Sequence, residues 1–193
     1  MDAAAQSEEQ IWILKTLQGD QEAFARLVTR YERQVYNLAY RMLGNAEDAE
    51  DAAQETFLRA YTALPSFQMG KKFSSWLLSI AANLCVDLLR RRRLAWLSLE
   101  DCSFRVASPA EEPDRAVLRR EEAGQVQRLL DRLPEKYRLV VILRYWYDLS
   151  YEEIASTTGL SLGTVKTRLH RARCMLARAI EEGKVCTAEV PVG

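Results

Sequence analysis

The sequence predicts an all-α protein built from two helical domains joined by a flexible linker. Helix-forming Ala, Leu, Glu, Arg and Gln dominate the 193 residues, and only five prolines and eight glycines interrupt them. Apolar side chains recur at steps of three and four residues, and alternating β-branched runs are absent. Since 48% of the residues are apolar, the chain has enough of them to build a hydrophobic core.

The first domain is predicted over residues 1–97. Its clearest helix spans about 20–43, where apolar residues follow the helical period up to Gly44, which ends it. Asn45 is a good N-cap for a second helix, which Pro65 ends.

A loop over 66–72 separates this helix from a third helix in the same domain. The third helix starts near Phe73 and ends in the basic run Arg90–Arg93. A short helix near 10–17 completes the predicted bundle.

Helical periodicity fails after the basic run. Ser, Pro, Glu and Asp collect over 98–113, which is typical of a flexible linker. Two helices follow, over about 114–133 and 135–147. The second domain is predicted over 114–182, with a C-terminal tail over 183–193.

The sharpest motif lies within 150–176. Ser150 and Glu153 fit a capping box for a short helix, Gly159 suits its left-handed end, and Ser161 caps a second helix. This layout predicts a helix-turn-helix, whose second helix reads the DNA major groove. An ordinary amphipathic helix with a solvated basic face is the alternative, but it accounts for only one of these coinciding features. The outward and flanking side chains are Lys166, Thr167, Arg168, His170, Arg171, Arg173 and Cys174.

Charge alternates in blocks although the formal net charge is zero. Residues 1–66 hold 11 acidic and 6 basic residues, and residues 67–97 hold 1 and 6. Residues 98–135 hold 9 and 6, and residues 136–193 hold 6 and 9. Two basic blocks indicate two separate polyanion contacts, and the acidic first block requires a different partner.

Other classes of function find little support in the sequence. There is no zinc-ligand spacing, nucleophile–base pair or phosphate-binding glycine loop, so no enzyme activity, catalytic residue, metal, cofactor or small-molecule substrate is expected. No uninterrupted apolar stretch approaches the ~18 residues of a membrane span, and the polar, acidic N-terminus is not a signal peptide. A cytoplasmic protein without membrane insertion is expected. The cysteines, expected to be reduced thiols, are Cys85, Cys102, Cys174 and Cys186.

Three segments resemble the sigma-70 family of bacterial RNA polymerase sigma factors. DAEDAAQETFLRAY (48–61) and FSSWLLSIAANLCVDLLRRRR (73–93) are similar to its region 2, and LPEKYRLVVILRYWYDLSYEEIASTTGLSLGTVKTRLHRARCML (133–176) is similar to region 4. The short linker, with no third domain between them, resembles the extracytoplasmic-function group. The resemblance implies an initiation factor that binds core polymerase, reads the −35 duplex and traps the melted −10 strand.

The resemblance also assigns residues. Core-polymerase binding, at the β′ clamp helices, falls on Asp48, Asp51, Gln54, Glu55 and Phe57. Contact with the −10 strand falls on Phe67, Lys71, Lys72, Asn83, Arg90 and Arg91. Contact with the −35 element falls on Lys166, Thr167, Arg168, His170, Arg171 and Arg173.

Some assignments stay open at this point. Trp76 is expected in the core, and the aromatics at 145–147 either pack in the core or support contact with the polymerase β flap. An anti-sigma factor is implied as a further partner beside core polymerase and promoter DNA. The rival hypothesis is a free-standing helix-turn-helix regulator that binds operator DNA as a dimer, which leaves the acidic helix and the Asn83 region without a role.

Overall fold

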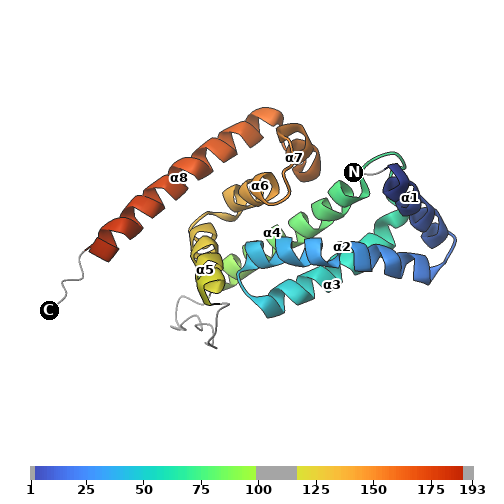
Figure 1. The fold of residues 1–193 in the computed structure, drawn as a ribbon, viewed down its shortest axis with the longest axis horizontal. Helices are drawn as coiled ribbons and strands as arrows, with labels where there is room; N and C mark the ends of the chain where they lie inside the picture. The colour runs from blue at the N-terminus through green and yellow to red at the C-terminus, as the bar shows by residue number, and fades with distance from the viewer. Residues whose placement is uncertain (1–2, 99–116, 189–193) are drawn as a thin grey trace.

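The computed structural model describes residues 3–98 and 117–188, and every regular element in these ranges is helical (Figure 1). The predicted all-α fold is confirmed. The elements are α1 (Ala3–Leu17), α2 (Gln21–Leu43), α3 (Ala46–Ala63), the 3₁₀ turn η1 (Leu64–Ser66), α4 (Phe73–Ser98), α5 (Val117–Asp131), α6 (Glu135–Tyr145), α7 (Tyr151–Thr158) and α8 (Leu162–Ala188).

Helices α2, α3 and α4 pack against one another, and α1 packs along α2. The helix boundaries follow from local caps. The Asp20 carboxylate accepts hydrogen bonds from two backbone N–H groups at the start of α2. Gly44 ends α2 with φ at 85°, a left-handed conformation that glycine adopts without strain. Asn45 caps α3, as the sequence predicts.

Three aromatic rings join the 66–72 loop to α4. Phe67 lies 5.6 Å from Phe73 and 5.2 Å from Trp76, measured between ring centroids. Phe73 is fully buried, and the half-buried Trp76 packs against the core, in agreement with its expected packing role. The loop is therefore anchored to the start of α4 through Phe67.

One segment of α4, Phe73–Leu94, is long and apolar enough by composition to cross a membrane, with a mean hydropathy of 1.2. This qualifies the expectation from the sequence. The segment nevertheless packs against α2, α3, α6 and α7, and Phe73, Leu77 and Cys85 are at most 1% exposed. Because a core helix passes the same test of composition, we assign no membrane span to α4.

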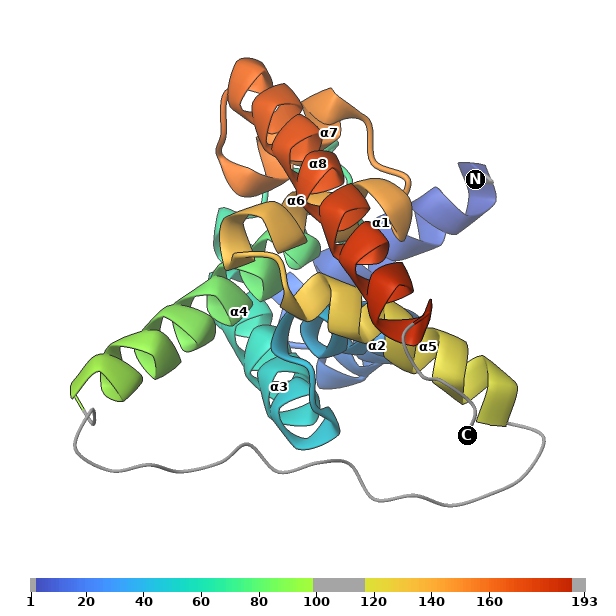
Figure 2. The same cartoon turned by 90° about the vertical axis from the view of Figure 1, so that its left-hand side faces the viewer.

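Helices α5 to α8 form the second group, in which α8 packs against α5, α6 and α7 (Figure 2). The predicted capping box is confirmed: Glu153 N–H donates to the Ser150 hydroxyl, and the Glu153 carboxylate accepts from Ser150 N–H. Gly159 closes α7 with φ at 68°. Both ends of the short helix therefore follow from local sequence.

Several helices are longer than the sequence predicts. α1 begins at Ala3, α4 continues past the arginine run to Ser98, and α8 reaches Ala188, within the segment predicted as a tail. Good helix formers, such as the alanines at 3–5 and Leu94 and Ala95, extend α1 and α4 without needing apolar periodicity. The end of α8 instead contains poor helix formers, including Gly183 and Thr187. The predicted linker, 98–113, lies outside the described residues except for its first position, and the described chain resumes at Val117.

The two groups of helices share one continuous hydrophobic core. α6 packs against α2 and α4, and α7 packs against α4. We call this contact the domain seam. The sequence predicts two helical groups, but nothing in it predicts that they pack together.

A buried arginine joins the two sides of the domain seam. Arg138 of α6 is 8% exposed and donates to the carbonyl oxygen of Met42, at the end of α2, at 2.6 Å. It also donates to the carbonyls of Asp131 and Leu133 and pairs with the Asp131 carboxylate at 3.1 Å. Burial lowers the pKa of Arg138, and Asp131 partly offsets this effect.

Other polar contacts cross the domain seam. The Gln127 amide donates to the carbonyl of Arg41 at 3.2 Å, and the Arg41 guanidinium lies 4.4 Å from the Trp146 ring centroid. The Tyr147 hydroxyl donates to the carbonyl of Gln34. These bonds fix the orientation of the two groups, because hydrogen bonds are directional and apolar contacts are not.

We expect Arg138→Ala to lower the free energy of unfolding by about 3 kcal/mol, because the substitution leaves buried carbonyls without a donor. Urea denaturation followed by circular dichroism measures this value. The exposed Arg178 provides a control, since Arg178→Ala should change stability by at most about 0.5 kcal/mol. A loss below about 1 kcal/mol for Arg138→Ala would show that the domain seam does not depend on this residue.

Candidate nucleic-acid interface

The N-terminal half of α8 has the two faces that a recognition helix requires. Val165, Leu169 and Ala172 are at most 1% exposed and pack against the core. The opposite side leaves four of the predicted duplex-reading residues exposed, namely Lys166, Thr167, His170 and Arg171. The major groove of DNA admits an α-helix. The exposed Arg and Lys side chains of α8 can therefore donate hydrogen bonds to guanine there.

A basic hollow lies between α6 and the start of α8. Its volume is about 400 Å³, and its lining includes Lys136, Tyr137, Arg168 and Arg171 but no acidic residue. The Arg171 guanidinium acts on the Tyr137 hydroxyl and lowers the Tyr137 pKa. Lys136 places its ammonium 5.1 Å from the Tyr137 ring centroid.

Lys136 and Tyr137 were missed by sequence reasoning. They precede the helix-turn-helix and lie on another helix, so no motif links them to α8. The nearest signal is local, since both residues follow Pro134 in the first turn of α6. Tyr137 is well placed to fix the direction in which Arg171 points.

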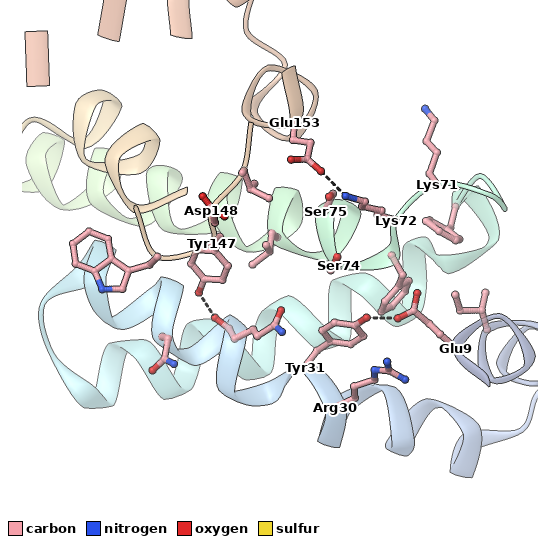
Figure 3. Close-up of a pocket in the computed structure, with 18 of the residues that line it drawn as sticks. Glu9, Arg30, Tyr31, Lys71, Lys72, Ser74, Ser75, Tyr147, Asp148 and Glu153 are labelled. Carbon is pink, nitrogen blue, oxygen red and sulfur yellow. Dashed lines mark hydrogen bonds and ion pairs between the residues drawn. The ribbon is translucent and has the colours of Figure 1, made fainter. Parts of the chain in front are cut away.

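The 66–72 loop contains three residues predicted to contact unpaired DNA. Lys71 is exposed, whereas Lys72 forms an ion pair with Glu153 of α7 at 2.5 Å (Figure 3). Phe67 is only 9% exposed, so in this structure its ring packs against α4 instead of facing solvent. Both lysines line a cavity of about 700 Å³ between the two groups of helices.

The remaining residues predicted to contact the −10 strand lie along α4. Asn83 and Arg90 are exposed and seven residues apart, which places them on one side of the helix. Arg91 is exposed as well. The structure therefore leaves an amide and two guanidinium groups accessible on a rigid element.

A second exposed surface follows α3. Asp51, Gln54, Leu58 and Tyr61 recur at helical spacing and are all exposed, with Leu58 at 65%. Leu58 and Tyr61 were not among the predicted residues, although their spacing from Asp51 could have identified them. An exposed apolar pair beside acidic and amide groups has the character of a protein-docking surface.

The other predicted residues of α3 are partly engaged within the protein. Asp48 pairs with Arg92 of α4, and Glu55 pairs with Arg59 at 2.7 Å. Phe57 is 9% exposed and belongs to the core. Its ring thus supports the helix from inside, and the exposed apolar group is its neighbour Leu58.

The described residues contain no group of three or more His, Cys, Asp or Glu side chains that could hold a metal ion. Cys174 lies 3.8 Å from His170 on exposed α8, measured from sulfur to Nε2. Cys85 is buried, and burial raises its pKa to about 12, so this thiol stays protonated. Cys85 thus acts as a small apolar group of the core.

Comparison with known proteins identifies the family of this chain. The sigma-70 region 2 model matches residues 27–95, and the sigma-70 region 4 model matches 123–176. The chain is 39% identical over 178 residues to the ECF RNA polymerase sigma factor SigW of Bacillus subtilis. The aligned region covers 88% of this chain and 95% of SigW. This chain belongs to the extracytoplasmic-function group of the sigma-70 family.

Further similarities agree with this membership. The sigma factor is 35% identical over 184 residues to the RNA polymerase sigma-H factor of Pseudomonas aeruginosa, covering 91% of this chain and 95% of that one. The solved structure of CnrH in complex with the cytosolic domain of CnrY matches with a TM-score of 0.68 and 27% identity, over 91% of this chain and 98% of CnrH. A free-standing regulator is not favoured, because the region 2 match includes the helices that such a regulator leaves without a role.

We expect Tyr137→Phe to weaken binding of a duplex −35 site by about two- to tenfold, because it removes the hydroxyl that interacts with Arg171 in the basic hollow. Fluorescence anisotropy with a duplex selected from a random library measures the effect. Arg171→Ala alone should cost about 1–3 kcal/mol.

Adding Tyr137→Phe to the Arg171→Ala variant should produce no further loss if the tyrosine acts through this arginine. Tyr145→Phe, at a 58% exposed position on the same helix, serves as the control. Additive losses in the double variant would contradict a positioning role for Tyr137.

Proposed function

We propose that this sigma factor binds core RNA polymerase through the exposed face of α3 and directs initiation by reading two parts of the promoter. The recognition face of α8 reads the −35 duplex. Asn83, the 66–72 loop and the arginines of α4 hold the melted non-template strand of the −10 element.

One observation carries this proposal. The chain contains both sigma regions in order, and in each region the residue types needed for DNA contact are exposed. Lys166 and Arg171 supply donors for base edges and phosphates. Asn83, beside Arg90, supplies an amide for a base together with a cation for the backbone.

The second DNA contact requires extraction of a base from the stack, which costs a few kcal/mol. A pocket must compensate for the lost stacking. The cavity beside Lys71 and Lys72 is one candidate location, because cations and the edge of the Phe67 and Phe73 aromatic cluster line it.

The face of α3 suits a large protein partner. Asp51 and Gln54 provide acidic and amide groups, and Leu58 with Tyr61 provides apolar area in the same row. We place the β′ clamp helices of core polymerase here, and we place the β flap against the second domain. Such a factor needs no catalytic residue or cofactor of its own and acts in the cytoplasm, beside the polymerase.

A regulatory protein partner belongs to the proposal too. CnrH, the similar solved structure, is in complex with the cytosolic domain of CnrY. We propose that an anti-sigma factor likewise binds the present chain.

Run-off transcription with purified core polymerase tests the proposed function. We expect promoter-specific transcripts from a genomic promoter library only when the sigma factor is added. Co-purification with core polymerase should depend on α3, so Leu58→Asp should reduce it, whereas Leu94→Asp, at a 55% exposed position on α4, should not. Absence of any transcript, with core polymerase active on a reference sigma factor, would refute the proposal.

We expect Asn83→Ala to impair −10 specificity and strand opening while core binding stays intact, because the exposed amide contacts the DNA base and not the polymerase. Permanganate footprinting of the melted region and a core pull-down measure the two effects separately. Gln125→Ala, at an exposed position in α5, provides the control. Normal opening at every promoter by Asn83→Ala would remove this residue from the site.

A further inference from the structure

The exposed side of α8 carries two side chains of the types that bind metal ions in proteins. His170 and Cys174 are four residues apart, which places them one helical turn from each other on the same side of the helix. The Cys174 sulfur lies 3.8 Å from His170 Nε2. Both residues are exposed, and within the described part of the chain neither side chain has another hydrogen-bond or ion-pair partner.

The distance between the two ligand atoms fits a single metal ion bound between them. A tetrahedral zinc ion binds a cysteine sulfur at ~2.3 Å and a histidine nitrogen at ~2.0 Å, so it holds these two atoms about 3.5 Å apart. The observed 3.8 Å is close to this value, and a small rotation of either side chain is enough to close the difference. Ligands four residues apart on one helix are also the arrangement by which the H-E-x-x-H motif binds zinc. The helix therefore supplies half of a tetrahedral site, and water completes it.

Neighbouring charges determine which cations this pair accepts. Arg171 and Arg178 lie three residues before and four residues after Cys174, so two guanidinium groups flank the thiol along α8. They repel any cation, and a hard, strongly hydrated ion such as Mg²⁺ gains little from sulfur to offset this repulsion. A softer ion gains a strong bond to the thiolate. The pair is therefore selective for thiophilic divalent cations, of which Zn²⁺ is the representative.

We propose that His170 and Cys174 form a reversible binding site for a thiophilic divalent cation, and that the bound cation weakens contact of α8 with the −35 duplex. The effect on DNA rests on the proposed function, whereas the cation site does not. The His170 imidazole cannot offer Nε2 to a base edge and to a metal ion together. Each ligand therefore lowers the affinity for the other. Structural zinc sites use four protein ligands, so an ion held by two is released more readily.

Absorption spectroscopy with Co²⁺ tests the cation site, because a Co²⁺–thiolate bond gives a charge-transfer band. We expect the full chain, kept reduced with a phosphine, to show this band and Zn²⁺ to displace it. Cys174→Ser should abolish the band. His170→Ala should weaken Co²⁺ binding by about tenfold or more, since loss of even an outer-shell partner costs about this much. The control, Cys102→Ser/Cys186→Ser, retains only Cys174 and the buried Cys85 and should keep the band.

Fluorescence anisotropy with a −35 duplex selected from a random library measures the effect on DNA. We expect saturating Zn²⁺ to weaken duplex binding by the wild type about fivefold or more, since loss of one base contact costs at least about this much. The affinity of Cys174→Ser should not respond to Zn²⁺. Each protein is compared with itself in the presence and absence of the ion, so any effect of the substitution on DNA binding cancels. Mg²⁺ at the same ionic strength should have no comparable effect on the wild type, which controls for screening of the DNA phosphates.

A wild-type chain without the Co²⁺–thiolate band, or a band that survives Cys174→Ser, would overturn the cation site. A normal band together with equal duplex affinity in the presence and absence of Zn²⁺ would overturn the competition with DNA. The band is recorded without DNA or polymerase, so it is independent of the proposed function. Absence of any run-off transcript while the band remains refutes the proposed function alone.

Discussion

The arrangement of the whole molecule depends on which groups donate hydrogen bonds to the backbone carbonyls at the end of α2. A helix leaves its last carbonyls without intrahelical donors, and here those carbonyls are covered by a second group of helices, away from water. Arg138 and Gln127 supply the missing donors to Met42 and Arg41. A cation at a helix C-terminus also interacts favourably with the negative end of the helix dipole. The domain seam is consequently specific, whereas apolar packing alone would tolerate several orientations.

That specificity determines which functional groups meet. With α6 docked over the end of α2, α7 lies against α4 and brings Glu153 to Lys72. The same docking leaves Arg171 and the rest of the α8 recognition face exposed, and it leaves α3 uncovered. The docking of α6 over the end of α2 thus determines which charged groups stay exposed to solvent and which pair with other groups of the same chain.

The local elements could be predicted because their causes are local. The period of α2, the capping box at Ser150 and the left-handed Gly159 depend on neighbouring residues. The domain seam could not be predicted, since nothing near Arg138 in sequence marks Met42 as its partner. The same holds for the predicted sites. Residue types in the sequence identified the basic face of α8. The burial of Phe57 could not be predicted, because it depends on how the helices of the bundle pack together.

The acidic and basic blocks that make up the formal net charge of zero pair in part with each other within the same chain. The alternating charge blocks predict contacts with polyanions, and the same complementarity operates within the chain. Glu135 belongs to the acidic block 98–135, and its partner Arg93 belongs to the basic block before it. Since an exposed pair adds little stability, the benefit of this pairing to folding is small. Its larger effect is on ligands, because a cation already paired with a carboxylate attracts a phosphate less strongly than a free one.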